Sequence, residues 1–124
     1  MRYIKLIGLN KKEIRKQIHN LEEKGIYFGK CISNLINDNN EIEIIFKVEN
    51  QFMDKKEYEN LTVDHDPRIT IGARVRIKST NEEFTLKSLY EFSISHKVVY
   101  CTSDGRNWQP STVYKRCEFV KWEA

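Results

Sequence analysis

The chain lacks the short motifs that mark the common enzyme classes. It contains no Gly-x-Ser-x-Gly elbow, no Walker phosphate loop and no paired-carboxylate motif. A catalytic cysteine or serine also needs a base within hydrogen-bond reach and an oxyanion hole. Cys101 and Cys117 instead lie among Val, Tyr and Phe, where cysteine is usually a small buried hydrophobe. We therefore expect no enzymatic activity, no catalytic residue and no cofactor.

Long apolar runs and paired cysteines are also missing. The longest apolar runs, such as IIF and VVYC, are far shorter than the roughly 20 residues that cross a bilayer. The first residues contain no secretory apolar region, and we interpret them as mature sequence. Cys31, Cys101 and Cys117 cannot all pair and have no Cys-x-x-Cys spacing, which favours buried thiols in a reducing compartment. These absences predict a cytoplasmic protein with no membrane partner.

Histidine is scarce, and its positions argue against a metal site. The tripeptide from Asp64 to Asp66 surrounds His65 with carboxylates, but adjacent residues of an extended segment point to opposite sides. His19 has Glu22 and Glu23 nearby on a predicted helix, a pair that still needs a third ligand from elsewhere. A solvated polar linker is the better interpretation of residues 64–66, and we expect no bound metal.

The composition that is present describes an ordinary globular protein. Of the 124 residues, 40% are hydrophobic and 31% are charged, which fits one compact domain with two closely packed parts, residues 1–68 and 69–124. Residues 1–71 carry 12 basic and 12 acidic side chains, whereas residues 72–124 carry 9 basic and 6 acidic ones. The whole positive surplus therefore lies in the second part, which favours an anionic partner there.

The first part has the pattern of a β-α-β-β unit. Residues 2–9 predict a strand, and Asn10 with Glu13 forms a capping-box pattern at the start of a helix. Gly25 is a plausible helix stop. The apolar stripe of this helix is formed by Ile14, Ile18 and Leu21.

A hairpin and a second, short helix complete the first part. Residues 26–36 and 41–49 read as two strands around an Asn- and Asp-rich turn. Residues 50–61 suit an amphipathic helix with Phe52, Tyr58 and Leu61 on its apolar face. Pro67 disfavours helix in the connector that follows.

The second part reads as antiparallel strands. Predicted strands span residues 73–79, 84–94, 97–102 and 117–122, with a further short strand after an Asp104–Gly105 turn. One helical turn, residues 110–114, precedes the last strand. The fold class is therefore α+β, an N-terminal β-α-β-β unit with a second short helix packed with a C-terminal antiparallel SH3-like small β-barrel.

Residues 103–120 gather unusual chemistry in this chain. Aromatic rings offer faces for a base, arginines offer fork-shaped cations, and short polar side chains offer hydrogen bonds. Together they match a nucleotide-like anion. The predicted ligand-binding residues are Arg106, Trp108, Gln109, Ser111, Thr112, Tyr114 and Arg116. Phe84 and Tyr90, or alternatively Arg74 and Arg76, complete the pocket from neighbouring strands.

A structural role competes for several of these residues. Val113 and Phe119 are expected in the core, and Trp108 is equally suited to core or ligand. Ser111 can simply cap the helical turn. The two arginines are harder to explain by packing, because Asp104 and Glu118 are the only acidic residues near them in sequence.

The chain's size, its β-α-β-β opening and the block DGRNWQPSTVYKRCEF resemble the first-described Thoeris anti-defence family of phage and prophage proteins. The resemblance implies a sponge that binds cyclic ADP-ribose isomers made by TIR-domain immune enzymes and sequesters them without cleavage. It also implies homodimers, sometimes assembled into hexamers, with pockets where protomers meet, in the cytoplasm of the bacterial host. Some members also take up cyclic oligonucleotide signals.

A different class of function fits the same residues. Small barrels with basic strands and exposed aromatic rings also bind single-stranded nucleic acid or protein partners. An SH3-like nucleic-acid- or protein-binding module is therefore the alternative hypothesis.

Overall fold

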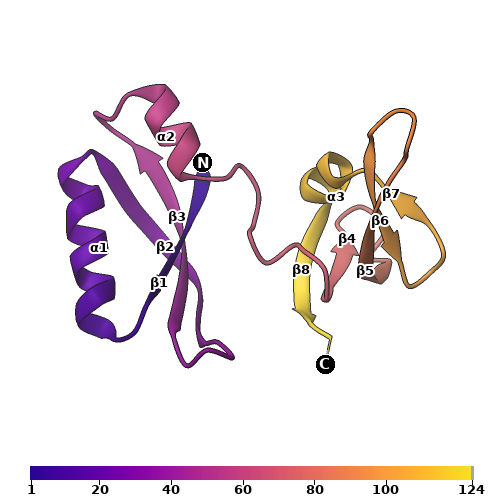
Figure 1. The fold of residues 1–124 in the computed structure, drawn as a ribbon, viewed down its shortest axis with the longest axis horizontal. Coiled ribbons are helices and arrows are strands. Elements are labelled where there is room, and N and C mark those ends of the chain that lie inside the picture. Colours follow the sequence, from indigo (N-terminus) through magenta and orange to yellow (C-terminus); the bar gives the residue numbers. More distant parts are fainter. Residues whose placement is uncertain (124) are drawn as a thin grey trace. The chain divides into compact units, whose positions relative to one another are not determined.

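The computed structural model describes residues 1–123 and divides them between two compact units (Figure 1). The first unit is Met1–Pro67, and the second begins at Arg68. Each unit combines helix with antiparallel sheet, so the predicted α+β class is confirmed. The sequence placed the division one residue later, between residues 68 and 69.

The first unit is a three-stranded sheet with a helix along one face (Figure 1). The sheet has the order β1-β3-β2, and both pairings are antiparallel. The predicted β-α-β-β order is therefore correct. Its elements are β1 (Arg2–Gly8), α1 (Lys11–Glu23), β2 (Ile26–Ile36), β3 (Ile42–Asn50) and α2 (Lys55–Leu61).

Local signals set both ends of α1 as predicted. The Asn10 side chain accepts a hydrogen bond from the Glu13 N–H at 3.0 Å, and the Glu13 carboxylate accepts from the Leu9 N–H at 2.7 Å. Gly25 follows the helix with a φ of +106°, and a Cβ there would lie 2.8 Å from the Met53 backbone nitrogen. Only glycine combines that conformation with that close approach.

The α1 side of the sheet carries the core of the first unit. Its buried residues are Ile4, Leu6, Ile14, Ile26, Val48, Met53 and Tyr58. The Tyr58 hydroxyl donates to the Val48 carbonyl at 2.9 Å, and burial raises the pKa of this phenol. Helix α2 begins only at Lys55, capped by Asp54, so Phe52 precedes it and is 88% exposed. The prediction that Phe52, Tyr58 and Leu61 form the apolar face of one helix is wrong for Phe52, which lies outside α2; Tyr58 is buried, and Leu61 is 39% exposed.

The second unit is a five-stranded antiparallel sheet with one short helix. The strand order is β7-β6-β5-β4-β8. Within residues 68–123 the two edge strands do not pair with each other, so the sheet does not close into a barrel. Its elements are β4 (Ala73–Ile77), β5 (Glu83–Glu91), β6 (Val98–Thr102), β7 (Asn107–Trp108), α3 (Pro110–Arg116) and β8 (Cys117–Trp122).

The core of this unit includes the residues that the sequence placed there. Val113 is fully buried, and Phe119 is partly buried against the core cluster. Cys117 is buried, and this burial raises the pKa of its thiol. Cys31, in the first unit, is exposed, so the expectation that all three thiols are buried is wrong.

Strand β5 does not keep the alternation that its sequence suggests. Phe84, Thr85 and Leu86 are buried one after another, and the register with β6 shifts between Leu86 and Ser88. β4 pairs only with residues 83–85, so residues 86–91 of β5 pair with β6 alone. We call residues 86–91 and their partners in β6 the β5–β6 ribbon. Tyr90, Phe92 and Ile94 continue the alternation of apolar and polar residues in the sequence, yet all three are exposed.

Candidate functional site

Three of the predicted ligand-binding residues form one stack in the second unit. The Arg106 guanidinium carbon lies 5.3 Å from the Trp108 ring centroid. The indole in turn stacks on Phe84, with centroids 5.3 Å apart and an interplanar angle of 15°. Phe84 is only 1% exposed, so the stack runs from the hydrophobic core to a half-exposed cation. We call these three residues the Arg106 stack.

Two carboxylates hold the outer member of the Arg106 stack. Arg106 Nε donates to Asp104 Oδ2 at 2.6 Å, and one terminal nitrogen donates to Glu82 Oε2 at 3.0 Å. These hydrogen bonds that Arg106 donates, first the one to Asp104 and then the one to Glu82, raise the pKa of Arg106. The sequence identified Asp104 as a nearby acid but missed Glu82, which is 24 positions away. The arginine is therefore oriented and charge-compensated before any ligand arrives.

Asp104 is itself fixed by several donors. Its carboxylate accepts hydrogen bonds from the Thr102 hydroxyl and from the backbone N–H of Arg106. Burial alone would raise the pKa of Asp104, but these bonds and the guanidinium outweigh it and hold the pKa below its ordinary value. At neutral pH this residue is therefore an anion.

Trp108 retains one unsatisfied polar atom. Its Nε1 is buried and has no hydrogen-bond partner among the residues that the structure describes. A buried donor without a partner costs stability, and such atoms merit a structural or functional explanation. The Trp108 side chain is otherwise partly buried and packs against the core cluster of the second unit.

Two more predicted residues line a shallow hollow of about 270 Å³. They belong to the segment that directly follows Trp108 in the sequence. Gln109 and Ser111, at the start of α3, line it with Pro110, and Lys97 and Val98 line it from the start of β6. No ion pair of Lys97 is found among residues 1–123. The sequence did not point to Lys97, because only the pairing of β6 with β7 brings it near Gln109. We call this the Lys97 hollow.

The other predicted residues occupy separate positions. The Tyr114 hydroxyl lies 2.9 Å from that of Tyr100, and Thr112 is partly buried within α3. Arg116 is exposed in the last turn of α3. Tyr90 is 54% exposed on the β5–β6 ribbon, with its ring edge-on to Phe92. The predicted set thus separates into the Arg106 stack, the Lys97 hollow and side chains that line neither.

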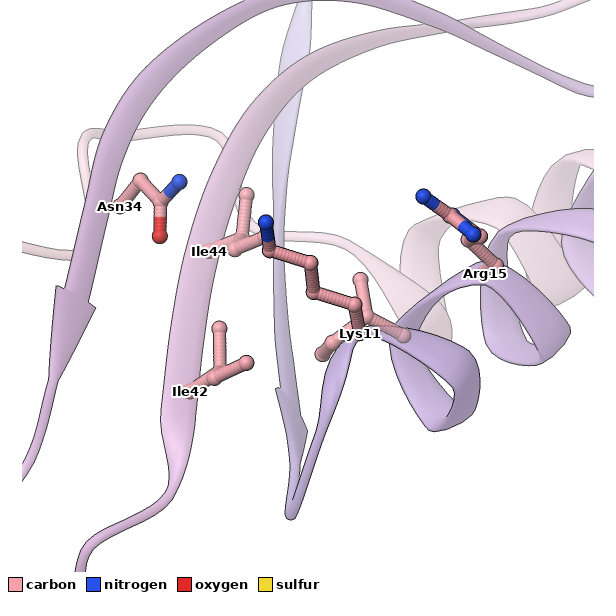
Figure 2. Close-up of a pocket in the computed structure, with 6 residues that line it drawn as sticks. Lys11, Arg15, Asn34, Ile42 and Ile44 are labelled. Atoms are coloured by element: carbon pink, nitrogen blue, oxygen red, sulfur yellow. The ribbon is translucent and has the colours of Figure 1, made fainter.

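A second hollow, in the first unit, was missed by the sequence analysis. It has a volume of about 210 Å³ and lies between α1 and the strands β2 and β3 (Figure 2). The sequence contained a signal for it: Lys11 and Arg15 are four residues apart on the predicted helix, and the apolar Ile14 lies between them. We call it the α1 hollow, and its lining residues are Lys11, Ile14, Arg15, Asn34, Ile42 and Ile44.

The histidines have carboxylate neighbours rather than metal-like surroundings. His65 Nδ1 lies 3.3 Å from Asp64, and His19 Nε2 lies 3.1 Å from Glu23. Across residues 1–123 no group of three or more His, Cys, Asp or Glu side chains is arranged to hold a metal ion. In the same range, no helix has the length and apolar character needed to span a bilayer.

Comparison with known proteins adds no relative. No family model, no curated protein and no solved structure matches this chain.

Proposed function

We propose that this protein binds and sequesters a small signalling nucleotide without cleaving it. The observation that carries the proposal is the Arg106 stack, in which a half-exposed guanidinium lies over an indole, with its carbon 5.3 Å from the ring centroid. A guanidinium plane held in this way is a stacking surface for a nucleobase. Asp104 and Glu82 hold that plane, so little conformational freedom is lost on binding.

The charge around the stack refines which part of the ligand it recognises. Asp104 and Glu82 already compensate Arg106, and their oxygens would repel a phosphate. They are suited instead to accept hydrogen bonds from an exocyclic amino group or from ribose hydroxyls. We assign the phosphates to Lys97, which lines the Lys97 hollow and forms no ion pair among residues 1–123.

The resemblance to the Thoeris anti-defence family supplies the identity of the ligand. On that basis the ligand is a cyclic ADP-ribose isomer made by TIR-domain immune enzymes, and the protein acts for a phage or prophage in the host cytoplasm. The same resemblance supports assembly as a homodimer, sometimes extended to a hexamer, and uptake of cyclic oligonucleotides as a second ligand class. Catalysis, a metal and a cofactor form no part of this proposal.

We also propose that the second unit is SH3-like. Two features support this assignment: the first strand, β4, lies between β5 and the last strand, β8, and a short helix precedes that last strand. An open five-stranded sheet of this order presents its loops and turns at its ends, where the Asp104–Gly105 turn carries the residues that orient Arg106.

Calorimetric titration with purified cyclic ADP-ribose isomers tests the binding proposal. We expect heat of binding at micromolar protein and ligand, and intact ligand recovered after heat denaturation of the complex. Recovery of cleaved ligand would show that the protein is a hydrolase and does not only sequester the nucleotide. Absence of heat with every isomer would contradict nucleotide sequestration.

A second candidate function rests on the β5–β6 ribbon. Tyr90 and Phe92 are exposed at its turn end, with ring centroids 5.2 Å apart. Lys87 lies in β5, and Lys97 directly precedes β6, with its carbonyl accepting from the Phe92 N–H at 2.9 Å. Exposed rings beside cations favour stacking with the bases of a single strand. Under this alternative, oligonucleotide affinity would fall steeply as salt rises, and a mononucleotide-sized ligand would bind weakly.

A further inference from the structure

The α1 hollow combines a charged mouth with an apolar wall. Lys11 and Arg15 are four residues apart, which places both side chains on the same face of α1. Figure 2 shows the Lys11 side chain extending from the helix toward the strands, and the Asn34 side chain entering the same space from β2. Polar ends from two elements therefore converge over the hollow.

Among the residues that the structure describes, the two cations have no carboxylate to neutralise them. Like charges at this spacing repel each other and weaken a helix. The acid in the first turn of α1, Glu13, accepts a hydrogen bond from the Leu9 N–H, and Glu43 of β3 pairs with Lys5 at 3.4 Å. Within residues 1–123, neither Lys11 nor Arg15 forms an ion pair, so an anion placed between them would relieve the repulsion.

The wall below the cations is apolar and only partly covered. Ile14 is buried under α1, while Ile42 and Ile44 of β3 are partly exposed. Ile36 of β2 pairs with Ile42 at the end of the sheet and is 69% exposed. The apolar surface thus continues from the hollow to the edge of the sheet, and water is a poor solvent for it.

We propose that the α1 hollow binds a small amphipathic carboxylate, with its carboxylate between Lys11 and Arg15 and its apolar part against Ile14, Ile42 and Ile44. The arginine fork matches the two oxygens of a carboxylate, and Asn34 can donate a further hydrogen bond. A volume of 210 Å³ equals roughly seven waters at about 30 Å³ each, which sets the enclosed ligand at a short chain or single ring. This site lies in the first unit and is independent of the nucleotide proposal.

The test is a nuclear magnetic resonance titration of the full chain with isoleucine methyl labels. The probe is octanoate, kept below its micellar concentration, and octylammonium serves as a probe of the same chain length and opposite charge. Octanoate should shift the methyl signals of Ile14, Ile42 and Ile44, whereas octylammonium should leave them in place. The proposal is overturned if octanoate gives no shift up to about 1 mM, or if both probes shift the same signals equally.

Matched charge variants make the test specific to the hollow. Lys11→Gln/Arg15→Gln should weaken octanoate binding by about tenfold, because two exposed ion pairs are lost. Lys12→Gln/Lys16→Gln removes the same charge from α1 at positions outside the hollow and should change the affinity by less than about twofold. Equal losses in the two variants would overturn the proposal. The wild-type comparison of the two probes decides the matter even if a variant folds poorly.

Discussion

The guanidinium of Arg106 lies over the indole of Trp108, with its carbon 5.3 Å from the ring centroid and its nitrogens bonded to Asp104 and Glu82. This relationship gives one side chain two roles, since the interactions that orient it for a ligand also tie the turn after β6 to the start of β5. Binding and folding should therefore be linked at this position.

Replacing Arg106 by Ala should lower both affinity and thermal stability. The change removes the stacking surface and leaves Asp104 and Glu82 without their shared cation. We expect binding of a cyclic ADP-ribose isomer to weaken by about 30-fold or more, and Lys to restore only part of the loss. Thermal melting beside ligand titration measures both effects. Early melting with normal binding would show that Arg106 is structural only.

Acid should destabilise the second unit. Hydrogen bonds from Thr102 and Arg106 more than offset the effect of burial on the Asp104 pKa, and the hydrogen bond from Arg74 lowers the pKa of Glu83. In the unfolded chain, the carboxyl groups of Asp104 and Glu83 bind protons more readily than they do in the folded protein. These two carboxylates therefore stabilise the folded protein above their ordinary pKa of about 4. The stabilisation is lost as the pH falls through their lowered folded-state pKa values.

Melting temperatures recorded between about pH 7 and about pH 3 test this dependence. Asp104→Asn should lower the melting temperature near neutral pH and flatten its fall in acid. An unchanged acid profile in this variant would mean that Asp104 is not held as an anion by its neighbours.

The three thiols should differ in reactivity. Cys31 is exposed, Cys101 is partly buried, and Cys117 is buried with a raised thiol pKa. Because the thiolate is the reactive form, alkylation of the native protein should proceed fastest at Cys31 and slowest at Cys117. Peptide mass spectrometry after a timed reaction gives the order. Early modification of Cys117 in the folded protein would contradict its placement in the core.

Val113→Ala should destabilise the second unit without a direct effect on the ligand. Val113 has no exposed surface, and truncation leaves a cavity that costs roughly 2 to 4 kcal/mol of the free energy of unfolding. Val98→Ala is the matched control, because Val98 is 39% exposed and its truncation should cost less than about 0.5 kcal/mol. Urea denaturation of both variants provides the comparison, and equal losses would contradict the assigned core.

Local signals account for the parts of the fold that the sequence predicted. The Asn10 cap, the Gly25 stop and the strand at residues 26–36 depend on neighbours in the chain, and the structure contains all three. The prediction for Phe52 was wrong because its apolar side chain fitted the helical spacing of Tyr58 and Leu61. The helix starts only after Asp54, which caps it two residues beyond Phe52.

Tertiary contacts explain what the sequence could not predict. Burial of β5 depends on how far β4 extends alongside it, which its own alternation does not encode. Glu82 accepts a hydrogen bond from Arg106, and Lys97 lines the same hollow as Gln109, only after the strands have paired. The α1 hollow likewise forms only because β2 and β3 lie beside the helix, which the sequence of α1 alone does not encode.

The central claim is most directly tested by calorimetric titration of the wild-type protein, Arg106→Ala and Arg76→Ala with cyclic ADP-ribose isomers at about 10 µM. Arg76 is the matched control, because it is an arginine of the same unit that pairs with Glu118 at 3.0 Å and is not part of the stack. We expect the wild-type protein and Arg76→Ala to bind one isomer with similar affinity and to release it intact, while Arg106→Ala binds at least about 30-fold more weakly. No binding by the wild-type protein, or equal binding by all three, would contradict the account.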